Sequence, residues 1–166
     1  MPGSPGWLDA TLNTIEQSGL GDTVRNTPYL YPILMSLHVL GIALLVGPII
    51  GVDLRLLGVG RSNLPVTVVL RYLLPLARVG FVIVVLTGAL MFTAIANAVG
   101  SSAAAPWKFG LIVVAGINIL IFHLKIYRNV TEWDIGVASP IQPKIAAVVS
   151  ATSWTGVIFA GRFLAY

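Results

Sequence analysis

Residues 29–52 have the sequence YLYPILMSLHVLGIALLVGPIIGV, a run of 24 positions without a charged side chain. A helix needs about 20 apolar residues to cross the hydrocarbon core of a bilayer, so this stretch is long enough to span a membrane. The whole chain agrees with this, because 57% of its 166 residues are hydrophobic and only 10% are charged. A soluble domain carries about a quarter charged residues. The sequence therefore predicts an integral membrane protein.

Three more apolar segments follow, and we expect spans at about 79–99, 106–126 and 144–164. The four spans predict an all-α, up-down four-helix bundle that forms one transmembrane domain from residue 29 to 166. The segment before the second span, residues 65–78, places two arginines among leucines. It fits either an interfacial lead-in helix or a long extension of the second span.

The basic residues indicate an orientation. Four lie between spans one and two and three lie between spans three and four, whereas only Arg25, Lys108 and Arg162 lie on the other side. Lysine and arginine are enriched in cytoplasmic loops. We therefore expect a multi-pass protein of the bacterial inner membrane with both termini on the periplasmic side.

Residues 1–28 have the pattern of a short amphipathic helix. Trp7, Leu8, Leu12 and Ile15 recur at helical spacing, and Gly19 is the expected end of the helix. The segment lacks the basic start and cleavage site of a signal peptide. We expect it to be retained and to lie on the outer membrane–water boundary, anchored by Trp7.

The composition excludes several classes of function. The chain has no cysteine, which removes disulfides, thiolate metal sites and cysteine nucleophiles. The charges sit at the ends of the spans rather than in a basic stripe, so we expect no nucleic-acid partner. No phosphate-binding loop, zinc-protease motif or Ser–His–Asp arrangement is present, and no residue is predicted to be catalytic. The protein is not expected to be an enzyme on its own.

Few polar side chains lie inside the spans, and each is a candidate for function because burial in hydrocarbon needs a partner. They are His38, Asn118, His123 and the hydroxyls and tryptophan of residues 150–155. Counting about 1.5 Å per residue from the outer boundary brings His38, Met91, Asn118 and Thr155 to one level in the outer leaflet. Such a layer is where a site inside a four-helix bundle would form.

Two cofactors suit this layer. Met35 and His38 lie three residues apart on one helix face, and with Met91 they form a soft donor set. This set suits Cu(I), or a b-type haem with His38 and Met91 as axial ligands. The alternative is that both methionines are packing residues and that His38 forms a structural hydrogen bond to Asn118 or Thr155.

His123 is the only other histidine. Spans one and three run in the same direction, and counting from their inner ends separates His38 from His123 by nearly 20 Å in depth, too far for one iron to bridge. His123 is therefore a ligand of a second cofactor or a packing residue near Tyr127. Arg162 is either a partner for haem propionates or an ordinary boundary arginine.

Asp53 and Arg55 stand at the inner end of span one. They are expected to form an interfacial ion pair of little energetic value. The glycines at 47 and 51 form a GxxxG spacing, which predicts close approach between helices. With Asp53 assigned to this pair, no carboxylate is expected inside the membrane.

Three short motifs carry a resemblance to known families: LHVLG at 37–41, DLRLLG at 53–58 and GRFLAY at 161–166. They resemble a family of small uncharacterised bacterial four-span proteins, itself distantly similar to copper-resistance D proteins and four-helix membrane b-type cytochromes. The resemblance implies an up-down bundle and a metal- or redox-linked role, with His38 matching the histidine of the first span. A two-haem cytochrome needs four histidines in level pairs, and this chain has two.

These observations leave three hypotheses for function. The first is an inner-membrane subunit that holds one haem b through His38 and exchanges electrons with a membrane or periplasmic redox partner. The second is a copper-handling protein that uses Met35, His38 and Met91. The third is a cofactor-free structural subunit of a larger complex or homo-oligomer, docked through its glycine faces.

Overall fold

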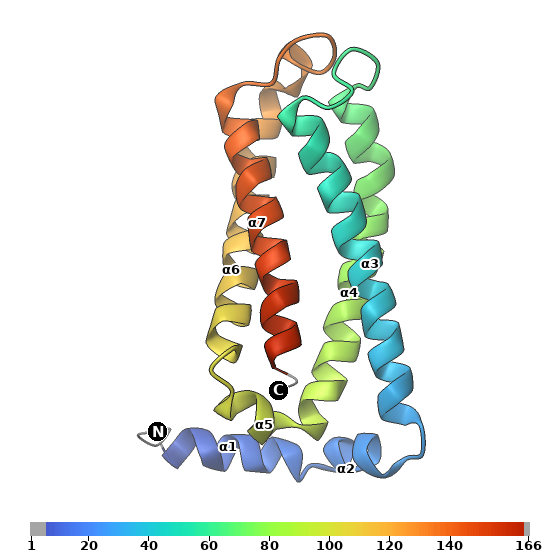
Figure 1. Cartoon of the computed structure of the whole chain (residues 1–166), viewed down its shortest axis with the longest axis vertical. Coiled ribbons are helices and arrows are strands. Elements are labelled where there is room, and N and C mark those ends of the chain that lie inside the picture. The colour runs from blue at the N-terminus through green and yellow to red at the C-terminus, as the bar shows by residue number, and fades with distance from the viewer. Residues whose placement is uncertain (1–5, 165–166) are drawn as a thin grey trace.

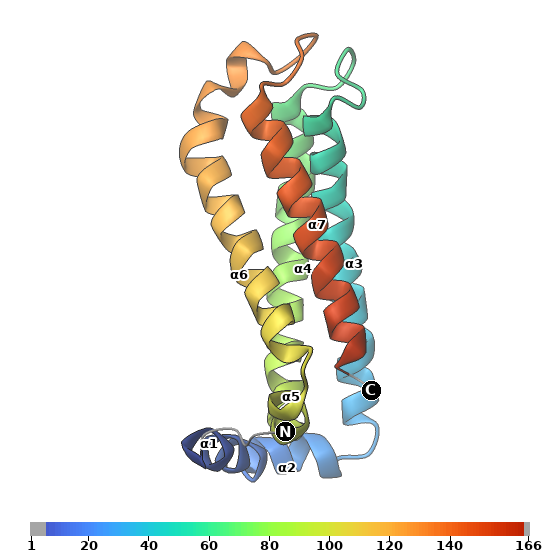
Figure 2. The ribbon, with the colours of Figure 1, turned by 60° about the vertical axis from the view of Figure 1, so that its left-hand side comes forward.

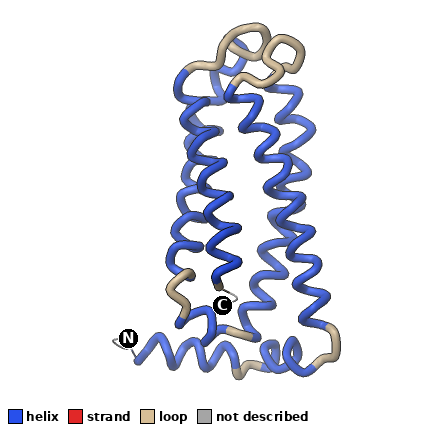
Figure 3. The backbone as a smooth tube through the Cα atoms, viewed as in Figure 1, coloured by secondary structure: helices blue, strands red, loops and turns tan. Residues whose placement is uncertain are grey.

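The computed structural model describes residues 6–164, and within them every regular element is a helix (Figure 3). Four candidate spans are long and apolar enough to cross a membrane. They are α3 (Leu30–Leu57), α4 (Val66–Ala94), the helical run Ala105–Glu132 and α7 (Ile141–Phe163). The predicted fold class is confirmed, and the chain is a multi-pass membrane protein built as a helical bundle (Figure 1).

The third span is one continuous run with a change of helix type. It consists of α6 (Ala105–Ile121), the π-helical turn η1 (Phe122–Ile126) and the 3-10 segment η2 (Tyr127–Glu132). Pro106 lies in its first turn, where a missing N–H removes no helical hydrogen bond. π-Helical turns are rare and occur frequently at functional sites.

The second span differs most from its predicted bounds. Of the two alternatives for residues 65–78, the structure shows the long extension, because α4 begins at Val66; it ends at Ala94, before the expected end near residue 99, and the short helix α5 (Ala96–Ser101) follows. The extension places Arg71 and Arg78 inside α4 rather than in a separate interfacial helix. Residues 66–78 contain one helix-breaking residue, Pro75, and α4 continues through it.

The four long helices form a ring that is open on one side. The helix α3 packs against α4 and α7, and α7 packs against α6, which gives the order α4–α3–α7–α6. The helices α4 and α6 do not form a packed pair. Figure 1 shows α6 and α7 side by side on the left and α3 and α4 on the right, and contacts between α3 and α7, which lie next to each other in Figure 2, join the two pairs. We call the side of the bundle between α4 and the end of the third span, where a small cavity is lined by residues of both, the lateral opening.

The α3–α4 pair is held by close backbone approach at Gly80. A Cβ atom at Gly80 would lie 2.4 Å from the backbone nitrogen of Leu45 and 2.8 Å from the carbonyl oxygen of Gly41. The predicted GxxxG pair does not make this contact. Gly47 has open space around it, and at Gly51 only the flexible end of Leu73 lies close.

Three short helices lie across one end of the bundle, which we call the platform end (Figure 1). The helices α1 (Gly6–Glu16) and α2 (Gly19–Asn26) pack on α5 and on the end of α4. Gly19 was predicted to end the N-terminal helix, but it begins α2, because the Ser18 hydroxyl accepts a hydrogen bond from Gly21 N–H and caps a second helix. Trp7, the predicted anchor, is 70% exposed.

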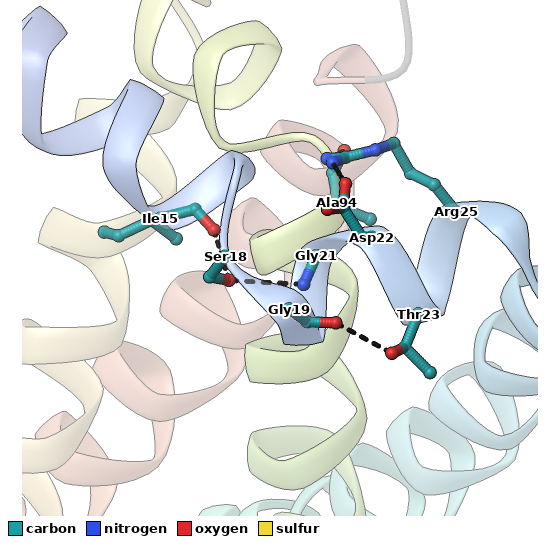
Figure 4. A network of polar contacts seen from close by, with 8 residues as sticks. All are labelled: Ile15, Ser18, Gly19, Gly21, Asp22, Thr23, Arg25 and Ala94. Atoms are coloured by element: carbon teal, nitrogen blue, oxygen red, sulfur yellow. Dashed lines mark hydrogen bonds and ion pairs between the residues drawn. The ribbon is translucent and has the colours of Figure 1, made fainter.

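A set of polar contacts fixes α2 to the bundle (Figure 4). The Arg25 guanidinium donates to the carbonyl oxygen of Ala94 at 3.1 Å and pairs with Asp22 on its own helix. A Cβ atom at Gly21 would lie 2.7 Å from the carbonyl oxygen of Thr93. The platform is therefore joined closely to the last turn of α4.

At the opposite end, the loop end, Arg55 and Asp134 tie the two inter-helix loops together. The buried Arg55 guanidinium donates to the carbonyl oxygens of Leu64 and Asp134. The Asp134 carboxylate accepts hydrogen bonds from both the backbone N–H and the hydroxyl of Thr67, in the first turn of α4. The predicted Asp53–Arg55 ion pair was wrong: residues two apart on a helix face different ways.

Candidate functional site

A cavity of about 590 Å³ lies inside the ring, towards its loop end. All four long helices contribute to its wall, and most of the lining side chains are leucine, isoleucine, valine and phenylalanine. Towards the platform it reaches Phe81 on α4 and Ile112 on α6. This volume lies within the range of small-molecule sites, roughly 300–1,000 Å³.

The apolar wall carries a small polar group of side chains where α3 meets α7. Asp53 is only 5% exposed, and its Oδ2 atom has no hydrogen-bond partner among the described residues. Ser150 on α7 lines the cavity close to the Asp53 carboxyl group. Trp154, one turn further along α7, lines the same cavity with its indole N–H unpartnered within residues 6–164. Asp53 Oδ2 is thus an unpaired acceptor and the Trp154 indole N–H an unpaired donor at this wall, and both atoms are covered by the side chains around them.

Asn118 lies on the α6 side of the cavity. Its side-chain amide donates to the carbonyl oxygen of Ala146 at 2.9 Å and joins α6 to α7. Asn118 was predicted to share a layer with His38 and Thr155. The side chain of Leu111 contacts Gly156, next to Thr155, and Leu111 precedes Asn118 by seven residues. Asn118 is therefore roughly 10 Å deeper than Thr155, and Thr155 itself is exposed on α7.

His38 lies outside this cavity, in the contact between α3 and α4. Its Nδ1 is 2.8 Å from the hydroxyl oxygen of Thr87, and the Thr87 hydroxyl donates to the carbonyl oxygen of Ile83. The Thr87 hydrogen is thereby committed, so its oxygen accepts a hydrogen from His38 Nδ1. The partner of His38 is thus Thr87, rather than Asn118 or Thr155. This tautomer leaves the Nε2 lone pair available.

The two methionines of the predicted donor set lie in different surroundings. Met35 is 46% exposed on α3. Met91 lies one turn beyond Thr87 on α4 and packs with Val24 and Leu34 under the platform. Among residues 6–164 no group of three or more histidine, cysteine, aspartate or glutamate side chains is placed to hold a metal ion.

The remaining predicted site residues lie at opposite ends of the bundle. Arg162 is on the last turn of α7 at the platform end. His123 is in the π-helical turn η1, where its Nδ1 lies 2.9 Å from the carbonyl oxygen of Ile119 and its ring packs near Phe122 and Tyr127. The prediction that His123 lies near Tyr127 is confirmed. His123 also lines the central cavity.

In comparisons with known proteins, the chain matches one family model, and the function of that family is unknown. The model of a family of unknown function (DUF6644) matches residues 13–166. No curated protein and no solved structure matches the chain.

Proposed function

We propose that this chain, which belongs to the family of unknown function DUF6644, holds one apolar molecule with a hydrogen-bonding group in its central cavity. The observation that carries the proposal is the unpartnered Asp53 oxygen, so described within residues 6–164, at the wall of a cavity of about 590 Å³. The ligand, for which the chain acts as a membrane-embedded binding protein, is taken from the surrounding lipid.

Access follows from the open ring. The helices α4 and α6 do not pack extensively against each other, and a cavity lined by α4 and by the end of the third span lies on this side of the ring. A molecule dissolved in the hydrocarbon therefore reaches the cavity through the lateral opening without crossing an aqueous surface. The apolar wall offers the hydrocarbon part of the ligand surroundings as apolar as the lipid it leaves, so packing and the polar contacts, rather than removal from water, decide the binding.

The polar group at the wall supports a particular kind of ligand. A buried polar atom without a partner costs about 1–3 kcal/mol. Asp53 Oδ2 can accept a hydrogen bond, and the Trp154 indole N–H can donate one. A hydroxyl group both donates and accepts, so it is a group that could partner either atom.

A pair of glycine variants on α6 tests the proposal. Gly116 lines the cavity and Gly110 does not, and a Cβ atom added at either position would have no neighbour within 4 Å. We expect Gly116→Phe to fill the cavity and lose any organic molecule that co-purifies with the wild type, as measured by native mass spectrometry. Gly110→Phe, on the same helix, should retain it. Equal retention by both variants would refute the proposal, and circular dichroism checks that both fold.

A second candidate function rests on His38. The hydrogen bond to Thr87 fixes the tautomer that presents Nε2, and histidines that bind metals commonly donate their other N–H in this way. We propose that Nε2 binds a b-type haem, which would supply one-electron transfer. An absorption spectrum of purified protein tests this: a Soret band lost in His38→Ala and shifted in Thr87→Val supports it. A colourless wild type after haem-sufficient expression rejects it.

We also propose that the protein lies in a bacterial inner membrane with the platform end on the periplasmic side. The distribution of lysine and arginine supports this orientation, because six of the ten lie in the loops or the outermost turns of helix at the loop end, whereas three lie at the platform end. Cysteines introduced singly at Ser101 and at Ser62 test it in intact cells. We expect an impermeant maleimide to label Ser101→Cys alone. Labelling of Ser62→Cys alone would show the opposite orientation.

A further inference from the structure

A second, smaller cavity of about 280 Å³ lies at the lateral opening, between α4 and the end of the third span. It shares Leu70, Leu74, Arg78 and His123 with the central cavity. The two cavities are therefore adjoining parts of one space. The central part is almost wholly apolar, whereas the smaller part also presents Arg71 and Tyr127.

The two arginines of the smaller cavity lie seven residues apart on α4, which places them on one face of the helix. They lie five and twelve residues after Val66, roughly 8 Å and 18 Å along the axis. Arg78 is thus well inside the length of helix that hydrocarbon covers. Neither guanidinium forms an ion pair with another residue in the described range 6–164. A cation at this depth without an anionic partner is strongly unfavourable.

The charges around the joined cavities do not balance. The charged side chains that line them are Asp53, Arg71 and Arg78, so one positive charge remains when all three are ionised. Asp53 lies at the contact of α3 with α7, across the ring from the lateral opening. The excess positive charge is therefore at the opening.

His123 adds a third group at the same place. Its Nδ1 lies 2.9 Å from the carbonyl oxygen of Ile119, which can only accept, so Nδ1 carries the hydrogen. The Nε2 atom has no hydrogen-bond partner in the part of the chain that the structure describes. When protonated, Nε2 donates a hydrogen bond as the arginines do.

We infer that the ligand is an anionic amphiphile, whose carboxylate or phosphate head binds Arg71, Arg78 and His123 at the lateral opening while its chain, which carries the hydrogen-bonding group of the proposed function near Asp53, fills the central cavity. Guanidinium groups bind carboxylates and phosphates by paired, charge-assisted hydrogen bonds. The inference rests on the proposed function and adds the chemical class of the head. It also gives Arg78 the partner that residues 6–164 do not provide.

Brominated lipids test this class, because bromine quenches tryptophan fluorescence at short range and Trp154 lines the cavity. The probes are dibromostearic acid and dibromostearyl alcohol, which have the same chain and differ in head charge. The protein is held in neutral detergent micelles, and Trp154→Phe identifies the signal of this residue. The double variant Arg71→Gln/Arg78→Gln removes the cations. The control is Arg61→Gln, an exposed arginine in the loop between α3 and α4 that lines neither cavity.

The acid is expected to bind the wild type about tenfold more tightly than the alcohol, which corresponds to one charge-assisted contact. That preference should disappear in the double variant and remain in Arg61→Gln. Equal affinity of acid and alcohol for the wild type would overturn the anionic head and leave the proposed function standing. Absence of quenching by either probe would overturn both.

A free anion is the other source of the same chemistry, and inorganic phosphate separates the two. Excess phosphate should leave the quenching by dibromostearic acid unchanged, because the chain in the central cavity holds the head in place. Displacement of the acid by phosphate would show a site for soluble anions and would overturn the inference.

Discussion

Gly80→Ala is the substitution whose effect the structure defines best. The added Cβ atom would lie 2.4 Å from the backbone nitrogen of Leu45, whereas ordinary contact begins at 3.4 Å. All three of its nearest neighbours are backbone atoms of α3, so no side chain can rotate away. The helices α3 and α4 must therefore separate by about 1 Å at this level.

The cost has two parts. Overpacking of this kind costs about 1–3 kcal/mol. A separation that reached Thr87 would also lengthen its 2.8 Å contact with His38 Nδ1 to about 3.8 Å, beyond hydrogen-bonding distance, at a further cost of about 1 kcal/mol. We expect a total of about 3 kcal/mol in the free energy of unfolding. For a chain of this size that lowers Tm by about 6–12 °C.

The assay is thermal unfolding in detergent micelles, followed by circular dichroism. The matched control is Gly47→Ala on α3, where the new Cβ atom meets nothing within 4 Å. Alanine is a better helix former than glycine, so the control should be neutral or up to about 1 kcal/mol more stable. If Gly80→Ala unfolds at the same temperature as Gly47→Ala, the close approach of α3 to α4 is not as described.

Two further substitutions test the ends of the bundle. Asp134→Ala removes the carboxylate that accepts two hydrogen bonds from Thr67, and should lower the free energy of unfolding by about 1–2 kcal/mol, whereas the exposed Glu132→Ala should change it little. Thermal unfolding measures both, and equal values would contradict the capping role. Gly21→Ala places a Cβ atom 2.7 Å from the carbonyl oxygen of Thr93, so limited proteolysis should cut α1–α2 faster than in Gly19→Ala, where space is open. Equal cleavage would show that α2 does not depend on this contact.

Much of the fold follows from the length of the apolar segments. The run from Tyr29 to Val52 requires a spanning helix, and the structure extends it to Leu57 because nothing before Gly58 breaks the helix. Gly58 has a φ of 112°, a conformation that favours glycine. The start of the second span was less predictable, because charged side chains suggest a boundary, yet a helix can carry arginine without ending.

The candidate site was only partly predictable. Ser150 and Trp154 were recognisable as polar groups within a span. Asp53 was not, because its neighbour Arg55 offered a partner in the sequence. In the structure Arg55 donates to a carbonyl oxygen of the loop end, whereas Asp53 lies close to Ser150 at the cavity wall. His38 was recognisable, but its partner Thr87 was not, since the register between α3 and α4 depends on which glycines meet. Gly80 decides that register, and no spacing rule distinguishes it from Gly47.

The platform has a mechanical consequence for the whole molecule. Its helices lie across the end of the bundle (Figure 1). Trp7 and Leu20 are exposed on them, which suits these helices to lie in the interface between lipid and water. Because the platform is attached to α4, its position at the interface fixes how deeply the platform end of the bundle lies in the bilayer. In a thinner or thicker bilayer, the difference between the hydrophobic length of the bundle and the bilayer thickness must then be taken up at the loop end, where the lateral opening lies. We expect bilayer thickness to change ligand uptake, and equal uptake in short- and long-chain nanodiscs would argue against this coupling.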